Sequence, residues 1–194
     1  MIKNLYVLGG GLSKRFKKDK LLIKFKNKFL IDILFDEIGS LFDNHYLVLD
    51  QFKNFQNSKF NLLQDIYNIK TPLNGIITSL QSSNTDKNFI CACDMPFIKK
   101  EVVEYLLSFD GYDVVVPYDG QYFEPLCSVY SKSFLQLAKK CIHDGIFSIN
   151  KCILFSDNIK TVPFNDLKIY DDKLISFFNI NSIDDLKEID GFEY

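Results

Sequence analysis

Arginine, tryptophan and long hydrophobic runs are scarce or absent in this sequence. There is no tryptophan, and only one of the 23 basic residues, Arg15, is an arginine. No apolar stretch approaches the ~20 residues that a membrane-spanning helix needs, and no signal peptide is evident, so we expect a cytoplasmic protein with no membrane partner. The formal net charge of −2 argues against nucleic acid as a partner bound over a broad face.

Several common functional motifs are also missing. Without a G-x-S-x-G motif, nucleophilic hydrolysis has no support, and His45 and His143 form no pair with a local Ser or Cys motif. The glycines match neither the G-x-x-x-x-G-K-[ST] loop of P-loop proteins nor the G-x-G-x-x-G loop of dinucleotide-binding proteins. The two most familiar nucleotide loops are therefore excluded.

The five cysteines are odd in number and irregularly spaced, which indicates reduced thiols. Cys91 and Cys93 form a C-x-C pair, but no second pair accompanies it and it lies in the apolar stretch Phe89–Cys93. This setting favours buried strand cysteines over a metal site.

Alternating strand and helix patterns predict the fold class. Hydrophobic residues make up 47% of the 194 residues, enough for the core of one domain. The expected strands are Lys3–Leu8, Tyr46–Leu49, Asn61–Gln64, Asn88–Cys93, Asp113–Pro117, Leu126–Tyr130 and Phe177–Ile180. The expected helices are Phe29–Phe42, Glu101–Phe109 and Lys132–Ile142. A further helix is expected to follow a Thr71–Gly75 turn and to run through Leu80, and a last helix is expected after its cap at Asn181-Ser182. This order predicts an α/β fold with a mostly parallel sheet and helices on both faces, while residues 143–175 show only weak periodicity.

A glycine-rich loop follows the first expected strand and precedes a cluster of cations. Residues 14–28 carry eight basic side chains against a single acid. Contiguous glycines let backbone N–H groups approach a phosphate, and an arginine fork can hold two phosphate oxygens at once. The residues of this possible polyphosphate cradle are Gly9, Gly10, Gly11, Ser13, Arg15 and Lys20. The alternative is a plain tight turn beside a solvated lysine patch.

Two acidic residues come directly after expected strands. Asp94 follows an apolar strand and precedes Met95-Pro96, which suits a Mg²⁺ ligand at the carboxyl end of a parallel sheet. A helix cap or turn aspartate is the alternative. Asp65 could accept hydrogen bonds from a base or ribose, and Gly75 could allow backbone close to that ligand. Taken alone, ordinary loop chemistry is the favoured explanation of these last two residues.

Taken together, these segments resemble the molybdenum cofactor guanylyltransferase family. Its usual first motif, L-A-G-G-x-S-x-R-M-G-x-D-K, is similar to residues 8–20 of this sequence. The resemblance continues at Asp65, Pro72-Leu73-x-Gly75, Cys93-Asp94-Met95-Pro96, Glu124-Pro125-Leu126 and Phe177-x-Asn179-x-Asn181-Ser182-x-Asp184-Asp185-Leu186. It therefore covers nearly the whole chain in the same order.

The resemblance implies a Rossmann-like nucleotidyltransferase fold and a Mg²⁺-dependent transfer of GMP from GTP to molybdenum-molybdopterin, with release of pyrophosphate. It places the nucleotide half at about residues 1–110 and the acceptor half at about 111–194 of a single domain. It also implies that Leu8, Gly9, Gly10 and Lys20 bind GTP, that Asp65 contacts the guanine or ribose, that Asp94 binds nucleotide and Mg²⁺, and that Asn179 and Asn181 lie near the pterin. Arg15, Lys20 and Asp94 would then be the catalytic residues. Transient contact with molybdenum-insertion proteins or apo-molybdoenzymes is a further expectation.

The sequence departs from the family pattern at three places. Gly9 replaces the usual alanine, Phe16-Lys17 replaces Met-Gly, and Leu49-Asp50 stands where the family has an asparagine after its second strand. The last departure keeps two alternatives open. One is a CTP-using relative that acts on molybdopterin or another phosphorylated acceptor, and the other is a catalytically silent nucleotide-binding domain.

Overall fold

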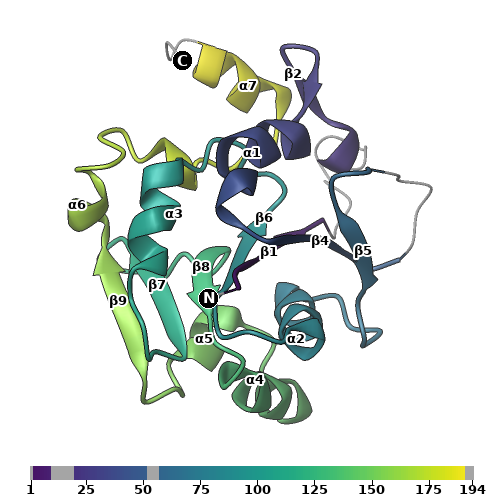
Figure 1. Cartoon of the computed structure of the whole chain (residues 1–194), viewed down its shortest axis with the longest axis vertical. Coiled ribbons are helices and arrows are strands. Elements are labelled where there is room, and N and C mark those ends of the chain that lie inside the picture. Colours follow the sequence, from purple (N-terminus) through teal and green to yellow (C-terminus); the bar gives the residue numbers. More distant parts are fainter. Residues whose placement is uncertain (1, 10–19, 52–56, 191–194) are drawn as a thin grey trace.

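A seven-stranded sheet forms the centre of the molecule, in a computed structural model that describes residues 2–9, 20–51 and 57–190 (Figure 1). Its strand order is β5-β4-β1-β6-β8-β7-β9. The strands are β1 (Asn4–Leu8), β4 (Asn44–Leu49), β5 (Asn61–Gln64), β6 (Asn88–Ala92), β7 (Val114–Tyr118), β8 (Cys127–Tyr130) and β9 (Ile159–Pro163). All neighbours are parallel except β8, which is antiparallel to both β6 and β7. The mostly parallel sheet is as predicted.

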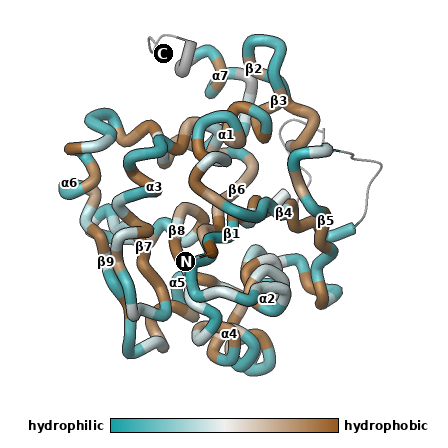
Figure 2. Tube along the Cα trace, in the orientation of Figure 1, coloured by the Kyte–Doolittle hydropathy of each residue, from teal (hydrophilic) through white to brown (hydrophobic). Residues whose placement is uncertain are grey.

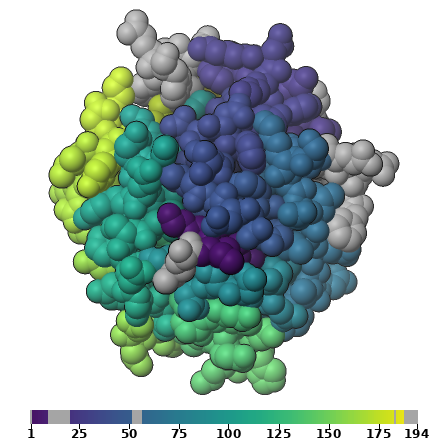
Figure 3. Space-filling view, viewed as in Figure 1, coloured from purple at the N-terminus to yellow at the C-terminus, as the bar shows by residue number. Residues whose placement is uncertain are grey.

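Helices cover both faces of the sheet. The helices are α1 (Leu30–Ile38), α2 (Pro72–Ser82), α3 (Lys100–Leu107), α4 (Phe134–His143), α5 (Ile149–Ile153), α6 (Phe164–Leu167) and α7 (Ile183–Asp190). One buried apolar cluster joins the sheet to α1 and α3, and a second joins it to α2, α4 and α5. The sheet lies between these helices (Figure 2), and the segments that hold α1 and α3 are at the surface of the space-filling view (Figure 3).

Several details of the sequence prediction are confirmed. The β5 strand has the predicted bounds, and the five cysteines are buried and free. Ser182 caps α7 as expected, because its Oγ accepts a hydrogen bond from the N–H of Asp185 at 3.2 Å while the Asp185 carboxylate accepts from the N–H groups of Asn181 and Ser182. Among the described residues, none of the helices has the length and apolar character that crossing a bilayer requires.

Other details were wrong or missed. The segment Phe177–Ile180 is not a strand, because the chain turns at Leu174, which has a left-handed backbone (φ 53°), into the short 3-10 helix Ile175–Phe177. Gly75 lies inside α2, which already begins at Pro72 with Thr71 as its cap, and not in a turn before the helix. The poorly periodic region 143–175 contains α5, β9 and α6.

A small hairpin also went unpredicted within the basic run. It pairs β2 (Lys24–Phe25) with β3 (Lys28–Phe29) through a turn in which Lys26 and Asn27 have positive φ. Its lysines have local contacts: the Lys24 and Lys26 ammonium groups lie over the rings of Phe29 and Phe25, and Lys28 pairs with Asp36. This part of the basic run therefore serves the hairpin and does not by itself indicate a phosphate cradle.

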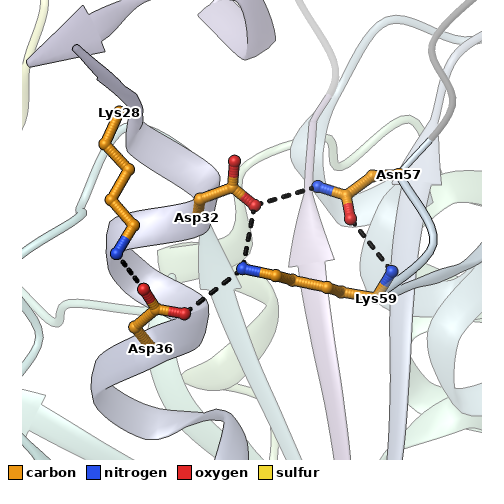
Figure 4. A network of polar contacts seen from close by, with 5 residues as sticks. All are labelled: Lys28, Asp32, Asp36, Asn57 and Lys59. Atoms are coloured by element: carbon orange, nitrogen blue, oxygen red, sulfur yellow. Dashed lines mark hydrogen bonds and ion pairs between the residues drawn. The ribbon is translucent and has the colours of Figure 1, made fainter.

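A network of polar contacts links this hairpin to the start of β5 (Figure 4). Asp36 on α1 pairs with Lys28 and Lys59, and Asp32 accepts a hydrogen bond from the Asn57 amide and pairs with Lys59 at 3.2 Å. The contact with Lys28, followed by that with Lys59, lowers the pKa of Asp36. Because these ion pairs are partly exposed, each contributes little stability, and the main result is to orient the chain that enters β5.

Candidate active site

The parallel strands β1, β4, β5 and β6 all end at one edge of the sheet, where the predicted site residues begin. Hydrogen bonds continue past the strand ends: the Gly9 N–H donates to the Val48 carbonyl at 2.9 Å, and the Cys93 N–H donates to the Leu8 carbonyl at 3.1 Å. The Asp65 N–H likewise donates to the carbonyl at the end of β4 at 2.8 Å. The first residues of these loops therefore have fixed positions, as the topology of such sheets requires.

The leucine side chains around Gly9 leave little space for a side chain at this position. A Cβ at Gly9 would lie 2.8 Å from Leu49 Cδ2, 3.0 Å from Leu47 Cδ1 and 3.1 Å from Leu21 Cδ2, all in buried side chains. An alanine would require the ends of these leucine side chains to shift within a close-packed region. The departure from the family's usual alanine thus has a packing cause in this chain.

Gly75 has a similar role at the start of α2. A Cβ there would lie 3.0 Å from both Cδ atoms of Leu8, so glycine lets the helix approach the end of β1 closely. Leu8 itself is buried, and its carbonyl accepts the hydrogen bond from Cys93. Both residues lie at the predicted edge, and the structure gives each of them a packing function there, while their contact with nucleotide stays a prediction.

Asp65 is the titratable group with the clearest perturbation at this edge. Its pKa is raised to about 6, mainly by burial and to a smaller extent by the negative charge of Asp50, while a hydrogen bond from Thr78 opposes the shift. That bond joins Thr78 Oγ1 to Asp65 Oδ1 at 3.2 Å, and the same hydroxyl accepts from the Ile66 N–H. A half-buried carboxylate held in one orientation can accept hydrogen bonds from a ligand.

Asp94 lies beyond the end of β6 with only 7% of its surface exposed. Its carbonyl accepts a hydrogen bond from the Ile180 N–H at 2.8 Å, so the C-terminal segment is held directly against this turn. Glu124, just before β8, is close enough for the charge of Asp94 to raise its pKa, although burial is the larger cause. The charges of these two carboxylates, which come from distant parts of the sequence, therefore interact.

The two asparagines predicted to contact the acceptor lie on either side of Ile180. Asn179 is exposed and Asn181 is half-buried. Since the Ile180 N–H is bonded to Asp94, both asparagines are held beside the Asp94 turn. This juxtaposition joins residues that are more than eighty positions apart in the sequence.

Most of the glycine loop lies outside the described residues, including Gly10, Gly11, Ser13 and Arg15. The backbone of Lys20 begins a 3-10 helix, Lys20–Leu22, but its side chain also lies outside what the structure describes. The roles predicted for these residues stay predictions.

Sequence reasoning did not single out two residues that the fold places at this site. Glu124 was noticed only as part of Glu124-Pro125-Leu126, and its proximity to Asp94 depends on β8 lying antiparallel beside β6. Thr78 contacts Asp65 from one turn beyond Gly75 in α2, and the available signal was the hydroxyl pair Thr78-Ser79 among the apolar residues of this helix.

Comparison with known proteins identifies relatives along the whole chain. A probable molybdenum cofactor guanylyltransferase of Natranaerobius thermophilus is 32% identical over 189 residues, which cover 94% of this chain and 92% of the relative. The molybdopterin-guanine dinucleotide biosynthesis protein A of Archaeoglobus fulgidus has a similar structure, with a TM-score of 0.81, 29% identity and coverage of 95% of each chain.

A more distant neighbour shares the fold alone. The 2-C-methyl-D-erythritol 4-phosphate cytidylyltransferase of Thermus thermophilus gives a TM-score of 0.73 at 10% identity, with coverage of 98% of each chain. The model of the MobA-like NTP transferase domain matches residues 5–154. With this match and a relative of 32% identity over almost its full length, the chain belongs to the MobA-like NTP transferase family.

Proposed function

We propose that the protein transfers GMP from GTP to molybdenum-molybdopterin and releases pyrophosphate. The observation that carries this proposal is the convergence of Asp65, Asp94 and the Asn179–Asn181 segment at the edge where β1 leads into the glycine loop. A nucleotide and a second, phosphorylated substrate could lie side by side there. The relatives named as guanylyltransferases support the choice of reaction.

The proposed reaction needs positioning and charge more than a reactive side chain. An oxygen of the acceptor's terminal phosphate attacks the α-phosphorus of GTP in line, a new P–O bond forms, and the bond to the β-phosphate oxygen breaks to release pyrophosphate. Arg15 and Lys20 neutralise the charge that develops on the leaving group. Asn179 and Asn181 orient the acceptor beside Asp94.

The carboxylates near β6 fit a magnesium ion that takes most of its ligands from the substrate. Mg²⁺ in nucleotide enzymes commonly uses one or two carboxylates together with phosphate oxygens and water. Within the described residues no group of three or more metal-ligating side chains occurs, whereas Asp94 and Glu124 supply a pair. When bound, the ion would offset phosphate charge, with Asp94 as its first protein ligand.

Asp50 and Asp65 suit guanine better than cytosine as the base. The hydrogen-bonding edge of guanine carries two adjacent donors, N1–H and the 2-amino group, and carboxylates act as acceptors. Cytosine offers one amino donor beside an acceptor that a carboxylate would repel. The two acids lie at the ends of β4 and β5, close enough for their charges to interact.

We expect titration calorimetry with Mg²⁺ to give at least about tenfold tighter binding of GTP than of CTP, or ~1.4 kcal/mol. Pyrophosphate release that depends on the molybdenum-molybdopterin acceptor should follow with GTP. Equal affinities for GTP and CTP, or tighter binding of CTP, would favour the CTP-using alternative. The cytidylyltransferase described above has a similar fold. GTP binding without any pyrophosphate release would favour a silent nucleotide-binding domain.

An Asp65→Asn variant should separate binding from stability. Because the folded-state pKa of Asp65 is raised from 3.8 to about 6, the folded protein holds this proton more tightly. The free energy of unfolding should therefore fall as pH rises from about 4 to about 6. At pH 7 the amide should raise the stability of the ligand-free protein by about 1–2 kcal/mol after solvent screening, while GTP affinity falls.

Urea unfolding at pH 4, 5, 6 and 7, paired with GTP calorimetry, would check this prediction. Asp157→Asn serves as control, because Asp157 is an exposed acid just before the start of β9, at the opposite edge of the sheet from Asp65. If Asp65→Asn destabilised the protein at pH 7 and left GTP affinity unchanged, Asp65 would be a structural residue.

A further inference from the structure

Asp171 is a fully buried carboxylate in the turn that leads to the proposed acceptor segment. None of its surface is exposed, and its Oδ2 accepts a hydrogen bond from the Ser176 N–H at 2.7 Å. Between them stands Leu174, whose left-handed backbone is costly for a residue other than glycine. The carboxylate therefore holds the start of the 3-10 helix Ile175–Phe177 in a conformation that the chain would not adopt unaided.

The same turn is attached to the loop that follows Asp94. The Ser176 Oγ accepts a hydrogen bond from the backbone N–H of Lys99 at 3.0 Å. The Lys99 ammonium lies 3.5 Å from Asp171 Oδ1, an ion pair with one exposed and one buried partner. A third contact joins the Ile180 N–H to the Asp94 carbonyl at 2.8 Å. These contacts fix residues 171–180 against residues 94–99 at both ends.

Burying a carboxylate to stabilise a turn carries a large desolvation free energy. Among the described residues Asp171 Oδ1 accepts no hydrogen bond, although the Lys99 ammonium lies 3.5 Å from it. Burial of a charge with incomplete hydrogen bonding destabilises a protein, and apolar replacements of such pairs are often neutral or stabilising. A contribution to stability alone therefore does not explain why Asp171 is an acid. A role in fixing the geometry of the active site does explain it.

From these contacts we infer that Asp171 is a positioning residue for the transfer reaction. Through its contacts with Ser176 and Lys99 it fixes the position of the Asn179–Asn181 segment relative to the Asp94 turn. This position aligns the acceptor phosphate with the α-phosphorus of GTP. Of the proposed nucleotide contacts, that of Asp94 adjoins this segment, and the hydrogen bond that links them uses the Asp94 backbone carbonyl, which a change at Asp171 leaves in place. The inference rests on the proposed function, in which Asn179 and Asn181 contact the acceptor.

The test is steady-state kinetics of Asp171→Asn in the full chain. The amide can still accept the Ser176 N–H bond but loses the charge that attracts Lys99. We expect kcat/KM for molybdenum-molybdopterin to fall on the order of 10- to 100-fold, since small misplacements of a reacting group cost this much. The GTP dissociation constant should change less than about twofold, well under 1.4 kcal/mol. The exposed neighbour variant Asp172→Asn, which keeps Asp171, should behave as wild type.

Ser176→Ala provides a second variant, because it removes the hydroxyl that binds the Lys99 N–H without adding volume. It should produce the same selective loss for the acceptor, even if Asp171→Asn folds poorly. Wild-type acceptor kinetics in the folded fraction of both variants, with only a lower Tm, would show a structural role and overturn the inference. Asn181→Ala separates the two proposals: if it leaves acceptor kinetics unchanged, the acceptor assignment itself fails, whatever Asp171 does.

Discussion

Replacement of Asp94 by asparagine is expected to lower the rate of nucleotide transfer by about 10²–10³-fold while leaving Tm close to that of the wild type. The side chain is buried at the end of β6, and the amide has the same shape. The backbone contact with Ile180 uses the Asp94 carbonyl and does not change. What the variant loses is the negative charge that would bind Mg²⁺ beside Glu124.

Initial rates over a range of Mg²⁺ concentrations, together with Tm, would measure this effect. Asp86→Asn is a matched control, because Asp86 is an exposed acid just before the opposite end of the same strand. Glu124→Gln should give a smaller loss if this residue is the second ligand. Wild-type activity and unchanged Mg²⁺ dependence in Asp94→Asn would remove the metal assignment.

Lys20→Ala should also reduce kcat/KM by about 10²–10³-fold, because one charge-stabilising contact to the leaving group is lost. The expectation comes from the position of Lys20 at the end of the glycine loop. If the basic run were only a solvated patch, each lysine in it would matter equally little. Lys20 is therefore expected to stand apart from its neighbours.

The hairpin lysines provide the control for this prediction. Lys24 lies over the Phe29 ring and Lys28 pairs with Asp36, so both have contacts that do not involve a ligand. Lys24→Ala and Lys28→Ala should keep most of the wild-type kcat/KM under the same assay. A normal kcat/KM for Lys20→Ala, or equal losses in all three variants, would contradict a specific role for Lys20.

Local patterns were enough to predict the strands that carry the site, but not the contacts between distant segments. Asn61–Gln64 was predicted with its correct bounds because an apolar pair lies between polar flanks. Phe177–Ile180 is equally apolar, yet Asp171 and the left-handed Leu174 turn this chain away from strand geometry. The β9 strand escaped notice because its half-exposed residues at the sheet edge show no alternation.

In the candidate site, too, local patterns predict the positions of single residues but not the contacts between distant segments. The positions of Asp65 and Asp94 at this edge could be predicted because Asp65 directly follows β5, Asp94 comes two residues after β6, and parallel strands end at a common edge. The proximity of Glu124 to Asp94 could not, since it requires knowing that β8 reverses direction and pairs with β6. The link from Asp171 to Lys99 depends on the tertiary fold in the same way.

The insertion of β8 between β6 and β7 has a consequence for any attempt to divide the chain. Its residues come more than thirty positions after β6, yet it covers the outer edge of that strand, whose five residues are all buried. A fragment that ended near residue 110 would present β6 as a bare, apolar edge strand, the kind of surface on which chains aggregate. The part that carries the glycine loop is therefore expected to need the later half of the sequence to avoid aggregation.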